Sequence, residues 1–449
     1  MSPLLRETHV TSTYRNWSEG HKTKQQFHHT KNKTKQNKTK QSFFPTTCLS
    51  SSSFNEKHPS LYFLHTSTMV PKPLPLNDNI FREDVAPGLV FEMELNKVYH
   101  STTSPFQQVQ VVDTYFGRTL ITDGKTQSAQ FDEYAYHESL VHPPMLQFAY
   151  NQQQQRRQQQ RKQQVASKNN DDNDNDDVAI GAKTVFIGGG GELATAREVL
   201  KHKSVEKVIM VDLDEVVVDA SVEYLPEWGG NSVKEDPRFE LIIGDAYAYL
   251  MDCTIQFDVI IMDLSDPIEA GPGVQLYTKE LYQHAASLLN PNGGVFVTQS
   301  GTADVIPPPH LQNHPNGVGE THESMCFVPI RNTLALAFPF TVPYSQSIPS
   351  FGGDWGFVMA SSSWTLASGD DNDDDGSSSS SLILGGGLDR ACAKVVDNLI
   401  ESQLKGGENS LKMYDGITHQ RMFSLTKALR KHLAKDDRIM TLDNPIFTY

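Results

Sequence analysis

Cysteine is scarce in this chain. Four occur in 449 residues, and they lack the spacing of a disulfide framework or a metal site. This pattern suits a reducing compartment and gives no reason to expect a bound metal. No run of about 18 apolar residues occurs, so no membrane span is expected. Basic residues are outnumbered by acidic ones, 39 to 54, and the net charge of −15 argues against a nucleic-acid-binding surface but is compatible with a cationic ligand.

Apolar residues are also in short supply. Their share, 38%, is below that of a wholly folded chain, so several segments should contribute nothing to a core. The first of these is an N-terminal extension, which over residues 1–68 is basic, rich in hydroxyl and amide side chains and poor in acids. It reads as a disordered extension, as an organelle-targeting peptide, or as upstream sequence before a true start at Met69. Unless residues 1–68 act as a targeting peptide, we expect a cytoplasmic protein.

Three further tracts have the composition of disordered inserts, at 151–177, 302–323 and 366–382. None has an apolar periodicity that could offset the entropy of ordering. The acidic tracts among them read as solvated loops rather than metal sites. The predicted parts of the chain are an extension at 1–80, a small N-terminal β-hairpin domain at 81–148, a low-complexity insert at 149–182, and a catalytic domain at 183–449.

The β-hairpin part has a short-range strand signal followed by a helical one. Val109–Asp113 and Arg118–Thr122 alternate like strands, and Asp123-Gly124 is a hairpin-turn signal. From Asp132 onward the pattern is helical until Pro143 stops it.

Apolar strands separated by helices characterise the catalytic part. The first strand, 184–187, ends in four glycines and precedes a helical pattern from Leu193 to His202. Further strands are predicted at 208–211, 241–243, 259–262 and 295–298, with a helix at 215–225. This alternation predicts an α/β fold with a parallel sheet covered on both faces, in which ligands bind beyond the carboxyl ends of the strands. Residues 328–361 and 384–449 should complete the sheet and add a helical tail, Met422–Leu433.

Polar clusters follow four of these strands. The glycine run Gly188–Gly191 lets the backbone approach a ligand closely, and Asp212 ends the next strand, where an acid commonly binds a ribose diol. Gly244–Ala246 follows the third strand and Asp263–Pro267 the fourth. Any one of these acids could cap a helix, but four clusters at one sheet edge favour an adenosine-binding site within a methyltransferase-like Rossmann fold.

Longer motifs are spread over the folded parts. They are Asp123–Ala129, Asp132–Glu138, Gly189–Glu192, Arg197–His202 and Asp263–Lys279. In these residues the chain resembles the spermidine/spermine synthase family of polyamine aminopropyltransferases, most closely its thermospermine synthase members. The resemblance spans residues 89–148, 183–300, 328–361 and 410–433.

The resemblance implies a transferase that uses decarboxylated S-adenosylmethionine as co-substrate and holds neither a permanent cofactor nor a metal. It implies that Asp263 accepts the proton of the attacking amine, that Tyr136 orients this amine, and that Asp266 anchors the polyamine. The residues implied in donor binding are Gln107, Gln127, His137, Gly189, Gly191, Glu192, Asp212, Asp245 and Ala246. Tyr344 joins Tyr136 and Asp266 on the polyamine side.

The charges of both substrates explain the acids. A sulfonium donor and a polyamine require an acidic site, and Glu133, Glu138 and Glu192 add to the charge of Asp263 and Asp266. A carboxylate at Glu192 would pair with the donor's ammonium and repel the carboxylate of ordinary S-adenosylmethionine. At about 4 Å and an effective dielectric constant near 20, like charges cost about 4 kcal/mol.

Several alternatives stay open for single residues. His137 either packs or contacts the donor, Gln127 could serve the turn, and Tyr136 could fill the core. His100 and His142 read as structural. Leu193 stands where the family usually has a small residue, which would narrow the donor pocket.

The product and the assembly are implied less directly. Glu192 in place of the Asp usual in spermidine synthases, together with the longer loop Ile268–Ala270, favours spermidine as acceptor and thermospermine as product. The alternatives are a spermidine or spermine synthase, a polyamine N-methyltransferase, or a silent polyamine-sensing paralogue. The family forms dimers or tetramers through its N-terminal hairpin region, so a homo-oligomer is expected.

Overall fold

The structure, a computed structural model, describes residues 79–86, 89–166, 180–268, 271, 273–303, 326–363 and 390–448. The extension predicted at 1–80 lies outside these ranges apart from its last two residues. The insert predicted at 302–323 also lies outside them apart from Thr302 and Ala303, and the one at 366–382 lies outside entirely. The boundaries predicted for the domains therefore stay predictions.

Two small antiparallel sheets open the described chain. The first pairs β1 (Ile80–Ala86) with β2 (Leu89–Glu94), and the second contains, in order, β3 (Lys97–Thr103), β4 (Gln108–Thr114), β5 (Gly117–Thr122) and β6 (Lys125–Ala129). The predicted turn between β5 and β6 is confirmed, since Asp123 and Gly124 both have positive φ, 48° and 77°. Val109, Val111 and Leu120 of the second sheet pack on Trp228 and its neighbours.

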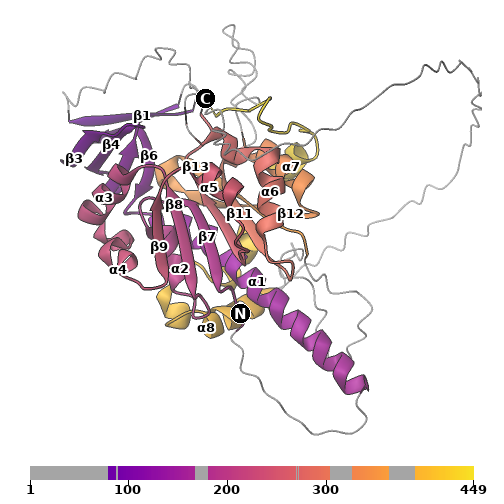
Figure 1. Cartoon of the computed structure of the whole chain (residues 1–449). Coiled ribbons are helices and arrows are strands. Elements are labelled where there is room, and N and C mark those ends of the chain that lie inside the picture. The colour runs from indigo at the N-terminus through magenta and orange to yellow at the C-terminus, as the bar shows by residue number, and fades with distance from the viewer. Residues whose placement is uncertain are drawn as a thin grey trace, which may run out of the picture. The chain divides into compact units, whose positions relative to one another are not determined.

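The helix that follows differs from the prediction. α1 (Glu133–Ala166) continues through Pro143 and Pro144 and into the Gln/Arg tract, so the predicted end at Pro143 and the predicted disorder of 151–166 are wrong. Buried side chains on both sides of the prolines, among them Val141 and Met145, hold the helix against the sheet. Beyond this core, Gln and Arg are good helix formers, and α1 projects past the sheet edge (Figure 1).

A seven-stranded sheet forms the centre of the catalytic part, in the order β12-β13-β11-β10-β7-β8-β9. All five predicted strands are confirmed as a parallel set, β7 (Thr184–Gly189), β8 (Lys207–Asp212), β9 (Phe239–Ile243), β10 (Val259–Asp263) and β11 (Val295–Thr302). β13 (Gly353–Ser361) pairs antiparallel with β11, and the edge strand β12 (Phe340–Ile348) pairs antiparallel with β13. This is a methyltransferase-like Rossmann fold, as predicted.

Helices cover both faces of this sheet (Figure 1). The described helices after α1 are α2 (Ala194–Leu200), α3 (Glu215–Tyr224), α4 (Gly230–Lys234), α5 (Ala246–Asp252), α6 (Lys279–Leu288), α7 (Phe327–Ala337), α8 (Arg390–Gln403), α9 (Gly416–Met422) and α10 (Lys427–Leu433). Ile187 of β7 faces the core shared with α1, α2 and α8, whereas Phe186 faces the core shared with α5, α6 and α7. None of the described helices combines the length and apolarity needed to cross a membrane.

The predicted C-terminal helix is two helices rather than one. α9 ends at Met422, and α10 starts after Thr426, whose hydroxyl accepts a hydrogen bond from the Leu429 N–H. A side chain that caps a new helix in this way favours a break in the helical run at that residue.

Candidate active site

The glycine run after β7 brings two strands into contact. Gly189 and Gly190 have positive φ, 79° and 77°, and the Gly190 N–H donates to the Asp263 carbonyl over 3.0 Å. A Cβ at Gly189 would lie 2.1 Å from that carbonyl oxygen, so no side chain fits there. The turn thereby places the end of β10 beside the loop that carries Glu192.

Asp263 lies at this junction and is almost fully buried. Its carboxylate accepts hydrogen bonds from the Tyr136 hydroxyl, 2.7 Å away, and from the Thr195 hydroxyl, 2.5 Å away. Burial, followed by the nearby charge of Glu192, raises the pKa of Asp263 to about 6. A carboxylate with this pKa is a stronger proton acceptor than an ordinary aspartate and is still ionised at neutral pH.

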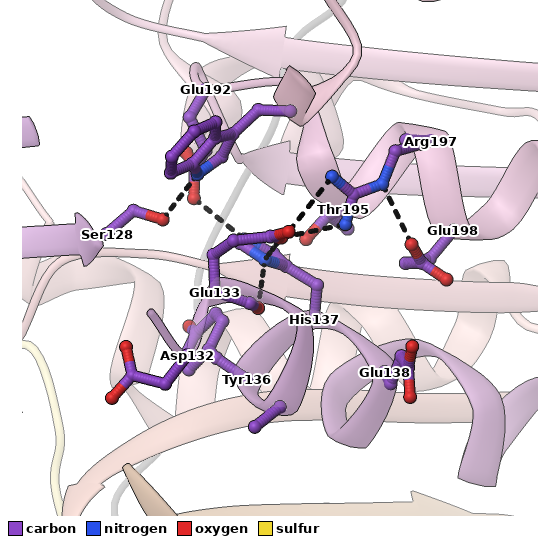
Figure 2. A network of polar contacts seen from close by, with 12 residues as sticks. Ser128, Asp132, Glu133, Tyr136, His137, Glu138, Glu192, Thr195, Arg197 and Glu198 are labelled. Atoms are coloured by element: carbon purple, nitrogen blue, oxygen red, sulfur yellow. Dashed lines mark hydrogen bonds and ion pairs between the residues drawn. The ribbon is translucent and has the colours of Figure 1, made fainter. Parts of the chain in front are cut away.

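The second acid of the site is Glu192, which ends a chain of charges (Figure 2). His137 Nε2 lies 3.0 Å from a Glu192 carboxylate oxygen, and His137 Nδ1 lies 2.6 Å from the Glu133 carbonyl and 3.2 Å from its carboxylate. Arg197 donates to the same Glu133 carboxylate over 2.8 Å. His137 therefore contacts Glu192; whether it also contacts a donor stays a prediction.

The protonation of this chain follows from its geometry. Burial disfavours a charged imidazole, but hydrogen bonds to Glu133 and Glu192 outweigh it and raise the pKa of His137 to about 10. Burial likewise opposes ionisation of Glu133, but the hydrogen bond and charge of His137, with Arg197, lower its pKa to about 2. At neutral pH His137 and Arg197 are therefore positive and Glu133 between them is negative.

His137, Glu192 and Asp263 also present donor atoms within 4.8 Å of one another, a spacing that could hold a metal ion. A protonated imidazole has no lone pair to offer a metal, and its Nε2 already faces Glu192. The absence of a bound metal therefore stays a prediction.

The strand ends beyond Glu192 carry the residues expected at the adenosine. Asp212 ends β8 and accepts a hydrogen bond from the Asp214 N–H over 2.9 Å; burial raises its pKa to about 7. A Cβ at Gly191 would lie 2.9 Å from the Asp212 carboxylate, so the two residues are in close contact. Gln107 donates to Asp214 over 3.0 Å, which places it at the same end of the sheet.

Asp245 and Ala246 lie at the start of α5. The Asp245 carboxylate accepts from the Tyr247 N–H over 2.8 Å and thus caps the helix, as the alternative interpretation allowed. Its second oxygen is 3.4 Å from the Gln275 amide. Ala246 is the first residue of the helix and is nearly buried.

Asp266 follows β10 and is held by one glutamine. Gln299 lies within β11, and its Nε2 is 3.2 Å from the Asp266 carboxylate, 2.7 Å from the Leu264 carbonyl and 2.6 Å from the Tyr277 hydroxyl. Burial raises the pKa of Asp266 to about 6. The structure thus sets two carboxylates of raised pKa at the end of the same strand.

Two predicted residues are not brought into the cluster. Tyr344 is fully buried between the rings of Phe357 and Phe423, and its hydroxyl donates to the Ser139 carbonyl over 3.0 Å. A hydroxyl already bonded in the core is not presented to a polyamine, so this geometry does not support the predicted contact. Gln127 is half-buried in β6, with its amide 3.3 Å from the Lys125 carbonyl.

Glu138 also departs from expectation. Its carboxylate is buried and accepts hydrogen bonds from three consecutive backbone N–H groups, of Lys412, Met413 and Tyr414. A carboxylate whose oxygens accept hydrogen bonds from three backbone N–H groups stabilises the fold, and it adds no free charge to the substrate site. His142, read as structural, is likewise buried, 3.0 Å from Glu198 and 3.1 Å from His202.

Glu138→Gln should therefore destabilise the fold rather than slow the chemistry. The amide presents an N–H₂ to a backbone N–H, so we expect the free energy of unfolding to fall by about 1–3 kcal/mol. Urea denaturation measures this change. Glu206→Gln removes an exposed acid with one ion pair, to Lys183, and should change stability by less than about 1 kcal/mol. An unchanged unfolding midpoint with a large loss of kcat would return Glu138 to the substrate site.

Activity should rise with pH through the pKa of the proposed base. Asp263 accepts a proton only when ionised, so kcat/KM for the polyamine should climb with a midpoint near pH 6 instead of near the ordinary 3.8. Asp266, with a similar pKa, and Asp212, with a pKa of about 7, can steepen this limb, and Asp266→Asn measured at a saturating donor concentration isolates the contribution of Asp263. His137 should stay protonated across the range. A limb centred below about pH 5 in Asp266→Asn would contradict the assignment of Asp263.

Sequence reasoning missed two supporting residues. Thr195 binds Asp263, and a hydroxyl in the first turn of the helix after the glycine run was a usable signal. Gln299 holds Asp266, and the strand-end rule extended to the fifth strand would have found it. The pairing of Arg197 with Glu133 had no signal in the chain, because the residues are 64 positions apart.

Known proteins resemble this chain over most of its length. The spermine/spermidine synthase domain model matches residues 133–365, and the spermidine synthase tetramerisation domain model matches 80–130. A polyamine aminopropyltransferase of Aeropyrum pernix is 36% identical over 82% of this chain and 94% of its own length. Thermospermine synthase ACAULIS5 of Arabidopsis thaliana is 37% identical over 66% of this chain and 75% of its own length.

Solved structures agree with these relatives. A spermidine synthase in complex with the transition-state analogue AdoDATO superposes with a TM-score of 0.55 and 25% identity, over 81% of this chain and 97% of that chain. The spermidine synthase of Thermotoga maritima shares the fold, with a TM-score of 0.55 and 24% identity over the same shares of both chains. The chain therefore belongs to the spermine/spermidine synthase family and is a polyamine aminopropyltransferase.

Proposed function

We propose that this protein transfers the aminopropyl group of decarboxylated S-adenosylmethionine to spermidine, giving thermospermine and methylthioadenosine. The observation that carries the proposal is the buried carboxylate of Asp263, hydrogen-bonded to Tyr136 and facing Glu192 at the glycine turn. Asp263 can take a proton from the attacking amine while Glu192 binds the donor's ammonium, and the proposed reaction requires both of these roles.

The donor is proposed to lie along the strand ends. Its adenosine would meet Asp212, Asp245 and Ala246, and its three-carbon chain would point toward Glu192. The aminopropyl ammonium then pairs with Glu192, whose carboxylate His137 holds in place. A donor that kept its carboxylate would meet the same charge in repulsion.

Transfer is proposed as a direct displacement. The amine nitrogen of spermidine attacks the carbon next to sulfur, the carbon–sulfur bond breaks, and its electron pair stays on sulfur as neutral methylthioadenosine. The attacking amine is protonated in water, so it must first give a proton to Asp263. Tyr136 donates to the Asp263 carboxylate and lies where it can orient the amine. Holding both cations between carboxylates offsets their repulsion and supplies the proximity that a bimolecular displacement requires.

The choice of thermospermine is supported by one relative and one residue. The Arabidopsis thaliana relative carries the name thermospermine synthase, and Glu192 stands where spermidine synthases usually have Asp. Residues 269 and 270 of the loop after Asp266 lie outside the described residues, so the loop adds only its sequence to this choice.

A homo-oligomer is proposed on the N-terminal sheets. These sheets fall within the match to the tetramerisation domain, and large apolar side chains are exposed on them, among them Leu89, Val90 and Tyr115. Apolar side chains gathered on a small sheet favour burial against a second copy. We also propose a cytoplasmic location, since the scattered cysteines suit a reducing compartment.

The test is an endpoint assay of the full chain with decarboxylated S-adenosylmethionine and either putrescine or spermidine. Chromatography that resolves thermospermine from spermine identifies the product. Thermospermine from spermidine supports the proposal. Spermine, or spermidine from putrescine, would overturn the product while keeping the reaction. Methyl transfer from S-adenosylmethionine would overturn the reaction itself.

A further inference from the structure

The C-terminal segment Arg438–Thr448 follows α10 and packs against α6 and α7. Met440 is fully buried, and its N–H donates to the Thr333 hydroxyl of α7 over 2.8 Å. Ile446 packs against the same core. The segment lies beyond residue 365, where the match to the spermine/spermidine synthase domain ends.

Two backbone hydrogen bonds of this segment meet the two ends of one loop. The Thr448 N–H donates to the Pro267 carbonyl over 2.7 Å, where the loop after β10 begins. The Lys279 N–H donates to the Met440 carbonyl over 3.0 Å, where that loop ends and α6 begins. The Thr278 side chain does not cap α6. The Met440 carbonyl therefore accepts a hydrogen bond from the Lys279 N–H, a group of the first helical turn that has no acceptor within the helix.

The held loop starts directly after Asp266. Beside it, the Thr448 hydroxyl donates to the Cys326 thiol over 3.3 Å. Cys326 in turn lies close enough to Asp266 to feel its charge. Burial, and to a smaller extent the charge of Asp266, raise the pKa of the Cys326 thiol to about 12. The segment therefore contacts the backbone next to Asp266 and a side chain near its carboxylate.

We propose that the C-terminal segment Arg438–Thr448 positions Asp266 for the acceptor polyamine by holding both ends of the loop that follows it. This inference rests on the proposed function, in which Asp266 anchors the acceptor. Thr448 and Met440 are then positioning residues, because they act through Pro267 and Lys279. The proposed donor contacts come from α1, the glycine turn and the ends of β8 and β9, and of these only Asp245 meets the held loop, through the Gln275 amide 3.4 Å away. Donor binding should therefore depend much less on this segment than acceptor binding does.

Thr448→Pro in the full chain tests the Pro267 contact. Proline has no N–H, so the variant removes the hydrogen bond to Pro267. We expect KM for spermidine to rise about tenfold, with KM for the donor unchanged within about twofold, because only the acceptor anchor loses its orientation. Thr448→Ala is the matched control, since it keeps the N–H and removes only the hydroxyl; its KM for spermidine should change less than about threefold. Deletion of residues 445–449 should reproduce the proline variant.

Hydrogen exchange separates this inference from the proposed function. Backbone amides of 264–282 should exchange faster in Thr448→Pro than in Thr448→Ala, whichever polyamine is the substrate. If the wild-type chain forms no aminopropyl product, the proposed function fails while the exchange result still decides whether the segment holds the loop. Unchanged exchange, an unchanged KM for spermidine, or an equal rise in both KM values would each overturn the inference.

Discussion

Asp263→Asn should lower kcat by about 10²–10⁴-fold while leaving donor binding nearly intact. The amide cannot accept the proton of the attacking amine, so the amine would have to be deprotonated by water. The amide keeps the size and shape of the side chain, but Tyr136 and Thr195 donate to different oxygens of Asp263, so its one oxygen retains only one of these two hydrogen bonds. Single-turnover measurement of methylthioadenosine release reports the chemical step, and titration of the donor reports binding.

Asp219→Asn is the matched control for this loss. Asp219 is exposed on α3 and forms one long ion pair with Lys234, so its variant removes the same charge from an exposed side chain outside the buried cluster. Its kcat should stay within about twofold of wild type, since exposed pairs contribute little. A kcat in Asp263→Asn that is also within a few-fold of wild type would show that another group accepts the proton.

Glu192→Gln should cost the enzyme its discrimination between the two donors. In the wild-type chain the Glu192 charge attracts the donor's ammonium and repels a carboxylate, a difference of up to about 4 kcal/mol, or a thousandfold. The variant also leaves the His137 imidazolium, still paired with Glu133, facing the donor site. A positive group there favours a carboxylate. The ratio of Kd values for S-adenosylmethionine and its decarboxylated form should therefore fall by about 10²–10³-fold.

Glu192→Asp serves as the charge-preserving comparison. It shortens the side chain by one methylene, keeps the anion and restores the residue usual in spermidine synthases. We expect it to retain most of the discrimination, with a weaker contact to His137. If Glu192→Gln kept the wild-type ratio of Kd values, the ammonium of the donor would lie elsewhere in the site.

The sheet could be predicted from the sequence because its strands are short apolar runs that glycine and helical patterns separate. Four of the five parallel strands begin and end within two residues of their expected places, and β11 continues four residues past its expected end at 298. The error at α1 has a different origin. Proline and polyglutamine were weighed as local signals, whereas burial of Val141 and Met145 on either side of the prolines decided the outcome. Tertiary packing of this kind cannot be read from a local pattern.

The sequence predicts those site residues that lie at the ends of strands. It does not predict contacts between groups that are far apart in the chain. Asp212, Asp263 and Gly189 follow from strand ends, which share one edge of a parallel sheet. Glu138 was expected to add negative charge to the substrate site. Its carboxylate instead accepts hydrogen bonds from the backbone N–H groups of Lys412, Met413 and Tyr414, which come at least 274 positions later in the chain. The bond from Tyr344 to Ser139, 205 positions away, is equally invisible in the sequence.

The most direct test is a crystal structure of the full chain with spermidine and methylthioadenosine, a pair that cannot react because no aminopropyl group is present. The proposed mechanism expects one amine nitrogen of spermidine within about 3.2 Å of the Asp263 carboxylate, with methylthioadenosine along the ends of β7, β8 and β9. The sulfur of methylthioadenosine should lie closer to Glu192 than this spermidine nitrogen does. Spermidine bound with its nearest nitrogen at another acid, and Asp263 contacting only Tyr136 and Thr195, would contradict the assignment of Asp263 as the base.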